Sequence, residues 1–325
     1  MIFWLDDALF FEKTVHDLDR LTLFRLAFRQ QHTLFISDNP DRPWQEETAT
    51  HFKKWCAALP ANLQQEVMLL ALGLRELDSN AITRGKAKPF WISQRTLPND
   101  TGACILTIEQ ALLAIALPFG ILLENQINDA AFLRHAMPPR WRNKLGEWEA
   151  QGRLRYLQGG GITELFSLVK FHCADANSRL TSGLPAVVWA YLHFVIYDHD
   201  GDSAAQASAH SQKLQNLLEE MGMKARSHQL WRRTQENYLP RAALEQHVAA
   251  KCTNAETITA TMAEIESLFQ GDAGVRHFFN MNELPCGKIF KKVFFDHDAQ
   301  YWDQVADRGA SAEMTVLAEN IAAAM

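Results

Sequence analysis

Two apolar runs in the chain end abruptly in acidic residues. In the clearer case, Phe194 to Tyr197 is followed by aspartates at alternate positions, Asp198, Asp200 and Asp202. A continuous apolar run of this kind is typical of a strand buried on both faces. Ligands of open α/β sheets gather beyond the carboxyl ends of the strands, so the pattern predicts a functional site at these aspartates.

The other apolar run, residues 115–123, leads into Glu124, and we expect it to form another buried strand. Asn128 and Asp129 follow as candidate N-cap residues of a helix. A third predicted strand, residues 153–158, runs into three glycines that permit a tight turn before the helical segment 162–171. Strands alternating with helices predict an α/β, Rossmann-like fold with a central, mostly parallel sheet.

The remainder of the chain has mainly a helical period, and 325 residues with 47% apolar content suffice for more than one domain. We expect an α-rich, mainly helical N-terminal region over residues 1–105 that serves in recognition or partner binding, with a short strand at residues 32–36 and a short extended piece at residues 89–92. Residues 97–102 are rich in turn formers and mark its boundary with a core over residues 106–250. Periodic segments after Pro240 predict a helical C-terminal extension, residues 251–325, packed on that core.

The order of these features resembles the topoisomerase-primase (TOPRIM) domain: a glutamate after the first strand, a glycine-rich turn, then Asp-x-Asp after a later strand. Residues 230–240, Leu-Trp-Arg-Arg-Thr-Gln-Glu-Asn-Tyr-Leu-Pro, are similar to the arginine-rich, Glu-Asn-Tyr-Leu segment of overcoming-lysogenization-defect (OLD)-like nucleases and related phage-defence effectors. The resemblance covers roughly residues 115–250. It implies a TOPRIM catalytic core.

The resemblance implies that Glu124, Asp198 and Asp200 are catalytic and bind a divalent metal, Mg²⁺ or Mn²⁺, with Asp202 as a further ligand. Carboxylate oxygens suit these hard cations, which can activate water or stabilise the leaving oxygen in phosphodiester cleavage. Asp129 and Glu236 are possible supporting acids. One departure from the family pattern is Asn125, which stands where many members have glycine directly after the glutamate.

Basic residues beside the acids are candidates for contacts with nucleic acid or phosphate. Arg232 and Arg233 lie where a fourth strand would end, and Lys288 follows an aromatic-rich segment. The net charge of -6 argues against a uniformly basic nucleic-acid binder but leaves room for a local basic surface. Solvated arginines on helix faces are an equally good interpretation of these positions.

Other interpretations of the acidic segments were weighed. A calcium loop beginning at Asp198 would need glutamate at its twelfth position, where the chain has Ala209. The second Asp-His-Asp, residues 296–298, is better explained as a helix start. For Asp202, capping the next helix is as good an interpretation as binding metal. The five cysteines are widely spaced without a Cys-x-x-Cys pair, which argues against zinc fingers and a disulfide framework.

Together these features predict a metal-dependent endonuclease, plausibly a toxic effector of a bacterial anti-phage system. Such effectors commonly work beside an ATPase sensor; no Walker A sequence occurs here, so we expect any ATPase to be a separate chain. We expect a cytoplasmic protein, because no secretion signal or membrane-spanning run is evident. The apolar faces of the helical C-terminal third could also serve a homo-oligomer, although packing within the chain is their default explanation. The alternative is a catalytically inactive TOPRIM-like scaffold or partner-binding subunit.

Overall fold

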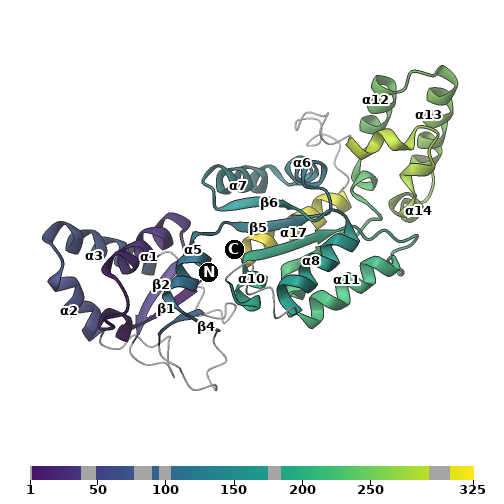
Figure 1. The fold of residues 1–325 in the computed structure, drawn as a ribbon. Helices are drawn as coiled ribbons and strands as arrows, with labels where there is room; N and C mark the ends of the chain where they lie inside the picture. The colour runs from purple at the N-terminus through teal and green to yellow at the C-terminus, as the bar shows by residue number, and fades with distance from the viewer. Residues whose placement is uncertain (1, 38–48, 77–89, 95–103, 175–183, 293–307) are drawn as a thin grey trace. The chain divides into compact units, whose positions relative to one another are not determined.

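The computed structural model describes residues 2–37, 49–76, 90–94, 104–174, 184–292 and 308–325 (Figure 1). The chain divides into two compact units, residues 1–118 with 179–188, and residues 119–178 with 189–325. Each unit contains a four-stranded sheet whose strand pairs are all parallel. The expected α/β class with parallel sheets is confirmed. The predicted boundary segment, residues 97–102, lies outside the described residues.

The first unit contains the helices expected from the sequence together with a four-stranded sheet that the sequence predicted only in part. Its sheet has the order β2-β1-β3-β4, with strands β1 (Ile2–Asp6), β2 (Thr33–Ser37), β3 (Phe90–Ile92) and β4 (Cys104–Leu106). The described helices are η1 (Asp7–Phe10), α1 (Asp17–Gln30), α2 (Thr50–Ala58), α3 (Ala61–Glu76) and α5 (Ile108–Ala116). Strands β2 and β3 match the extended pieces predicted at residues 32–36 and 89–92. Strands β1 and β4 were not predicted, because strands of three to five residues between longer helices have a weak pattern.

The predicted strand over residues 115–123 is shorter than expected. Helix α5 ends at Ala116, and β5 begins only at Phe119 (Phe119–Leu123). A capping box in which Thr107 and Gln110 satisfy each other's backbone N–H groups starts the helix. Pro118 favours extended backbone at the residue before it, which ends the helix. A continuous apolar run cannot by itself distinguish a buried helix from a buried strand.

The second unit has the sheet order β6-β5-β7-β8. These strands are β5, β6 (Leu154–Gln158), β7 (His193–Tyr197) and β8 (Ser227–Gln229). The short helix α10 (Ala186–Leu192) precedes β7, so the apolar run over residues 184–197 is also part helix, part strand. Because β5 and β7 are parallel neighbours, residues that follow them meet at one edge of the sheet.

Helices cover both faces of this sheet, as Figure 1 shows. Ile121, Phe194 and Ile196 belong to a core shared with helices α6 (Gln126–Ala136) and α7 (Pro139–Ala150). Leu122, Val195 and Tyr197 face the opposite layer, formed by α8 (Ile162–Ala174) and α11 (Ala209–Glu220). Alternate strand residues therefore enter different cores, as strand geometry requires.

The C-terminal part of the chain is helical, as predicted. Its described helices are η4 (Gln235–Tyr238), α12 (Arg241–Lys251), α13 (Ala255–Gln270), α14 (Ala273–Phe278), η5 (Met281–Glu283), η6 (Gly287–Lys292) and α17 (Arg308–Ala324). Met314, Leu317 and Ile321 of α17 are fully buried in the same core as β5 and β7. The last helix is thus part of the layer that covers the sheet.

A buried carboxylate ties α17 to the residues that follow β8. Glu313 is 1% exposed, and its Oε1 accepts hydrogen bonds from His228 Nε2 at 2.9 Å and from the Trp231 backbone N–H at 2.8 Å. Its Oε2 accepts one from the Tyr238 hydroxyl at 2.6 Å. One side chain accepts from three donors, so its loss would remove the acceptor of two buried side chains, His228 and Tyr238, and of the part-buried Trp231 N–H.

We predict that Glu313→Ala lowers the free energy of unfolding by about 3 kcal/mol, because breaking a buried charged network leaves unpaired polar groups. Urea denaturation measures this loss. Glu319→Ala, on the exposed side of the same helix, is the matched control and should change stability by less than about 0.5 kcal/mol. Equal stability of the two variants would contradict the structural role of Glu313.

Candidate functional site

Two of the predicted acids meet at the carboxyl edge of the second sheet. Glu124 follows β5, Asp198 follows β7, and the register pairs Leu122 with Val195. The Asp198 backbone N–H donates a hydrogen bond to Glu124 Oε1 at 2.9 Å. Both acids are half-buried. The spatial proximity expected from the two strand endings is therefore present.

The glycine-rich turn after β6 holds Glu124 from the other side. The backbone N–H groups of Gly160 and Gly161 both donate to the Glu124 carbonyl oxygen at 3.0 Å. These glycines have φ values of +86° and +106°, which are unfavourable for residues with a side chain. The backbone N–H of Ile162, at the start of α8, hydrogen-bonds to Glu124 and favours its charged form.

The pKa values of both acids are raised, although the backbone N–H groups of Asp198 and Ile162 stabilise the charged form of Glu124. Burial raises the pKa of Glu124 to about 7, with further increases from the negative charges of Asp129 and Asp200. Burial also raises the pKa of Asp198 well above its ordinary value. The negative charge of Glu124 is the next largest cause of this increase. Carboxylates held this close repel one another unless protons or a cation neutralise them.

Asp129 is the third acid of the cluster. Its two carboxylate oxygens accept hydrogen bonds from the Asn125 backbone N–H and from Gln235 Nε2, both at 2.8 Å. Burial raises its pKa to about 6, and the charge of Glu236 contributes to that increase. The negative charge of Glu236 also raises the pKa of Asp198. Both supporting acids thus lie within electrostatic reach of the pair.

The residue that departs from the family pattern has a structural role. The Asn125 side chain accepts hydrogen bonds from the backbone N–H groups of Ile127 and Asn128, so it is the N-cap of α6. The prediction that Asn128 and Asp129 cap this helix was wrong by three or four residues. Asn is a favoured N-cap residue because its short side chain reaches the free N–H groups of the first turn.

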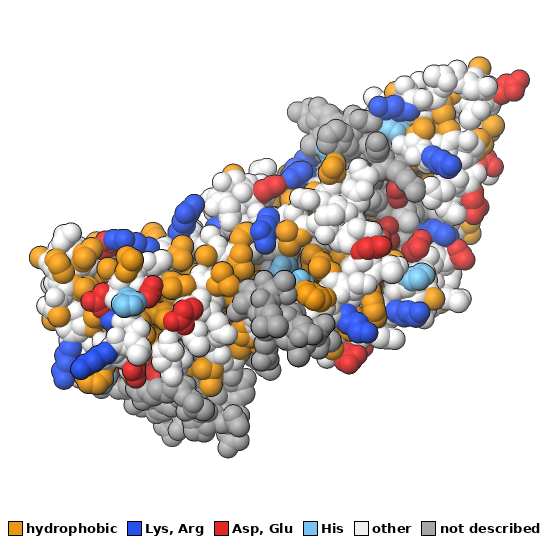
Figure 2. Space-filling view, in the orientation of Figure 1, with side chains coloured by type: hydrophobic (Ala, Val, Ile, Leu, Met, Phe, Trp, Pro, Cys, Tyr) orange, Lys and Arg blue, Asp and Glu red, His pale blue; other side chains and the backbone are white. Residues whose placement is uncertain are grey.

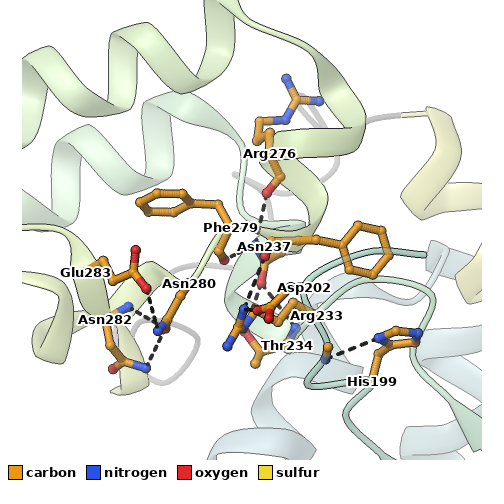
Figure 3. A network of polar contacts seen from close by, with 12 residues as sticks. His199, Asp202, Arg233, Thr234, Asn237, Arg276, Phe279, Asn280, Asn282 and Glu283 are labelled. Carbon is orange, nitrogen blue, oxygen red and sulfur yellow. Dashed lines mark hydrogen bonds and ion pairs between the residues drawn. The ribbon is translucent and has the colours of Figure 1, made fainter. Parts of the chain in front are cut away.

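The loop after Asp198 places its two further aspartates differently. Asp200 is exposed, has a φ of +51°, and donates its backbone N–H to the Arg233 carbonyl oxygen at 2.7 Å. A left-handed conformation at a non-glycine residue is uncommon and occurs often at functional sites. Asp202 is 92% exposed at its side chain and forms an ion pair with Arg233 (Figure 3). The structure therefore favours Asp200 over Asp202 as a partner of Asp198.

The basic residues expected to contact phosphate have different surroundings. Arg232 is 5% exposed, donates to the Asn237 carbonyl oxygen at 2.9 Å, and lies over the Tyr238 ring. Arg233 forms an ion pair with Asp202, whereas the Lys288 side chain on η6 is exposed. Asn237 itself donates to the carbonyl oxygens of Arg276 and Phe279 (Figure 3). The Glu-Asn-Tyr-Leu segment is thus a structural junction between β8 and the C-terminal helices.

A small cavity joins the acids. Glu124, Asp129, Asp198 and Gln235 line it together with apolar side chains of β5, β7 and α6, and it has room for about one water-sized group. Gln235 was not predicted as a site residue, and its position beside Glu236 is the sequence feature that could have indicated it. Among the described residues, no three His, Cys, Asp or Glu side chains are arranged to hold a metal ion.

The donor chemistry nevertheless fits Mg²⁺ or Mn²⁺. All the available donors are carboxylate and amide oxygens. A bound cation would offset the two causes that raise the pKa values of Glu124 and Asp198, burial first and neighbouring negative charge second. Mg²⁺ usually binds one or two protein carboxylates and completes its shell with water and substrate phosphates. Glu124 and Asp198 can supply that minimal set.

The remaining acidic segments do not add to this site. In the first unit, Asp6 accepts hydrogen bonds from Ser93 Oγ and the Ala8 backbone N–H. Asp7 accepts from two backbone N–H groups at the start of α2. These contacts cap helices and join strand ends. The Asp-His-Asp segment at residues 296–298 lies outside the described residues.

Comparison with known proteins found no matching family model, no matching curated protein and no matching solved structure. In the part of the chain that the structure describes, no helix is long and apolar enough to cross a membrane. On the face in Figure 2, Lys and Arg side chains are interspersed with acidic and apolar ones.

We predict that stability depends on pH through Glu124. Because its pKa is raised from 4.5 to about 7, the folded protein binds this proton more tightly than the unfolded chain. The free energy of unfolding should fall as the pH rises from about 4.5 to about 7. Glu124→Gln, which keeps an acceptor for the Asp198 N–H, should be more stable than the unsubstituted protein at pH 8 by about 1 kcal/mol.

Denaturation in metal-free buffer at several pH values measures this difference, which should vanish near pH 4. The exposed Glu147 on α7 gives the control variant, Glu147→Gln, for which no such pH dependence is expected. A constant difference between Glu124→Gln and the unsubstituted protein across this range would contradict the prediction.

Proposed function

We propose that the protein is a metal-dependent nuclease with a TOPRIM-like catalytic core in its second unit. The observation that carries the proposal is the Glu124–Asp198 pair, two acids at the ends of adjacent parallel strands with raised pKa values. The backbone N–H of Asp198 donates a 2.9 Å hydrogen bond to the Glu124 carboxylate. Neighbouring carboxylates that repel one another are typical of sites that bind a cation.

Glu124 and Asp198 would hold the metal, with Asp200 as the next ligand after the loop adjusts. A bound Mg²⁺ or Mn²⁺ stabilises charge on a phosphodiester and makes water more acidic. Because metal binding needs ionised carboxylates and burial raises the pKa of Glu124 to about 7, the site would release a proton when it takes up the metal near neutral pH. Gln235 and the Asn125 backbone N–H keep Asp129 oriented beside Glu124.

The substrate and setting of the proposed activity rest on the resemblance of the Asp-x-Asp and Glu-Asn-Tyr-Leu segments. They extend the proposal to DNA or RNA cleavage by an effector of anti-phage defence in the cytoplasm. A separate ATPase would then act as sensor, and a homo-oligomer is a possible assembly. Lys288 is an exposed cation in the second unit and a candidate contact for the nucleic-acid backbone.

A second candidate function is a scaffold that has kept the fold without catalysis. It is favoured by the present use of the acids as hydrogen-bond acceptors for backbone N–H groups, Glu124 for Asp198 and Asp129 for Asn125. It is also favoured by the finding that no three metal-ligating side chains converge among the described residues. Metal binding separates the two candidates.

We predict that the protein binds Mn²⁺ and that Asp198→Asn weakens this binding at least tenfold, because it removes a charge from the buried pair. Isothermal titration calorimetry at pH 8 measures the affinity. Asp202→Asn is the matched control in the same loop, since Asp202 is exposed and paired with Arg233. Binding that Asp198→Asn leaves unchanged would exclude this metal site, and no binding at all would support the scaffold.

We also predict cleavage of nucleic acid in the presence of Mg²⁺ or Mn²⁺. The purified protein is incubated with plasmid DNA, single-stranded DNA and total RNA, and compared with Glu124→Gln and Glu147→Gln. Glu124→Gln should reduce the rate at least a hundredfold, while Glu147→Gln, far from the acids in sequence and exposed, should retain it. Cleavage that Glu124→Gln leaves unchanged would contradict the assignment.

A further inference from the structure

A larger cavity lies beside the Glu-Asn-Tyr-Leu segment. Its volume is about 450 Å³, within the range of small-molecule sites. Its lining comes from the end of η4, the start of α12, and residues of α13 and α14: Arg232, Tyr238, Leu239, Pro240, Arg241, Ala242, Glu245, Phe269 and Arg276. Neither the metal site nor the proposed cleavage uses this cavity.

The cavity has an excess of positive charge. Three of its lining residues are arginines, Arg232, Arg241 and Arg276, against one acid, Glu245. Glu245 forms an ion pair with Arg241, and Glu266 reaches Arg241 at 3.8 Å. The Arg276 side chain extends away from the Asn237 network in Figure 3. Its guanidinium lies over the Phe269 ring, 4.6 Å from the centroid.

The start of α12 adds backbone donors to this cavity. Pro240 is the residue before the first turn, and its side chain makes no capping hydrogen bond with the backbone N–H groups that follow. Arg241 and Ala242, the first two residues of the helix, line the cavity. A helix N-terminus attracts anions through its free N–H groups and its dipole, and here it acts together with the arginines.

The remaining residues that line the cavity are aromatic or apolar. Phe269 and Tyr238 present aromatic rings, and Leu239, Pro240 and Ala242 are apolar. A guanidinium group can stack on a planar ring, and it can also donate two parallel hydrogen bonds to the oxygens of one phosphate. A ligand that combines a phosphate with a planar ring would use both features.

We propose that this cavity is a nucleotide-binding site, with Arg241, Arg276 and the start of α12 receiving the phosphate and Phe269 packing against the base. The ligand is either a free mononucleotide or the 5′-phosphorylated end of a strand. Arg232 and Tyr238 connect the cavity to Gln235 and Glu236 through the short helix η4. The site does not depend on the metal centre.

The test is titration of the full-length protein with AMP, ATP, and a short oligonucleotide bearing either a 5′-phosphate or a 5′-hydroxyl group. All titrations contain EDTA and 0.15 M KCl, so that neither a metal bridge nor general charge attraction accounts for binding. We expect binding of AMP or ATP if the ligand is free, or of the 5′-phosphorylated oligonucleotide alone if it is a strand end.

Arg241→Gln and Arg276→Gln should each weaken this binding at least tenfold. Lys251→Gln, at the far end of α12, is the matched control, and Asp198→Asn tests independence from the acids; both should bind as the unsubstituted protein does. Circular dichroism confirms that each variant is folded. The proposal is overturned if no probe binds, or if binding survives both arginine substitutions unchanged.

Discussion

The hydrogen bond from the Asp198 backbone N–H to the Glu124 carboxylate is the contact on which the proposed site depends. It exists because β5 and β7 are adjacent and parallel, so that residues far apart in sequence follow their strands at one edge. The glycine turn after β6 and the start of α8 hold Glu124 from its other side. The sheet, the turn and the helix thus all contact one residue, Glu124: the turn binds its backbone carbonyl oxygen, and the N–H groups of Asp198 and Ile162 bind its carboxylate.

This convergence has an electrostatic cost. Glu124, Asp129 and Asp198 all have raised pKa values, with burial as the largest cause and neighbouring negative charge as a further one. A purely structural pair would be equally well served by amides, which carry no charge to bury. Acids are favourable at these positions if a cation enters with a substrate and neutralises them, as the proposed nuclease requires.

The sequence was sufficient to place Glu124 and Asp198 together, since the rule for parallel strand ends needs only the apolar runs and the acids after them. In the first unit it indicated β2 and β3 but not β1 and β4, which are too short to show a pattern, and it missed Asn125, which caps a helix that begins earlier than predicted. The role of Glu313 was not predicted, and Arg232, predicted as a phosphate contact, is buried. Both depend on contacts distant along the chain, or on local turns that periodicity does not reveal.

The most direct measurement is anomalous diffraction from crystals grown at pH 8 and soaked in Mn²⁺. That pH lies above the pKa of about 7 for Glu124, so the ionised form of this carboxylate is favoured and protons compete less with the cation for it. The proposed site requires an anomalous peak within ligand distance of both the Glu124 and Asp198 carboxylates. Well-ordered carboxylates with no peak between them, in crystals saturated with Mn²⁺, would contradict the metal centre.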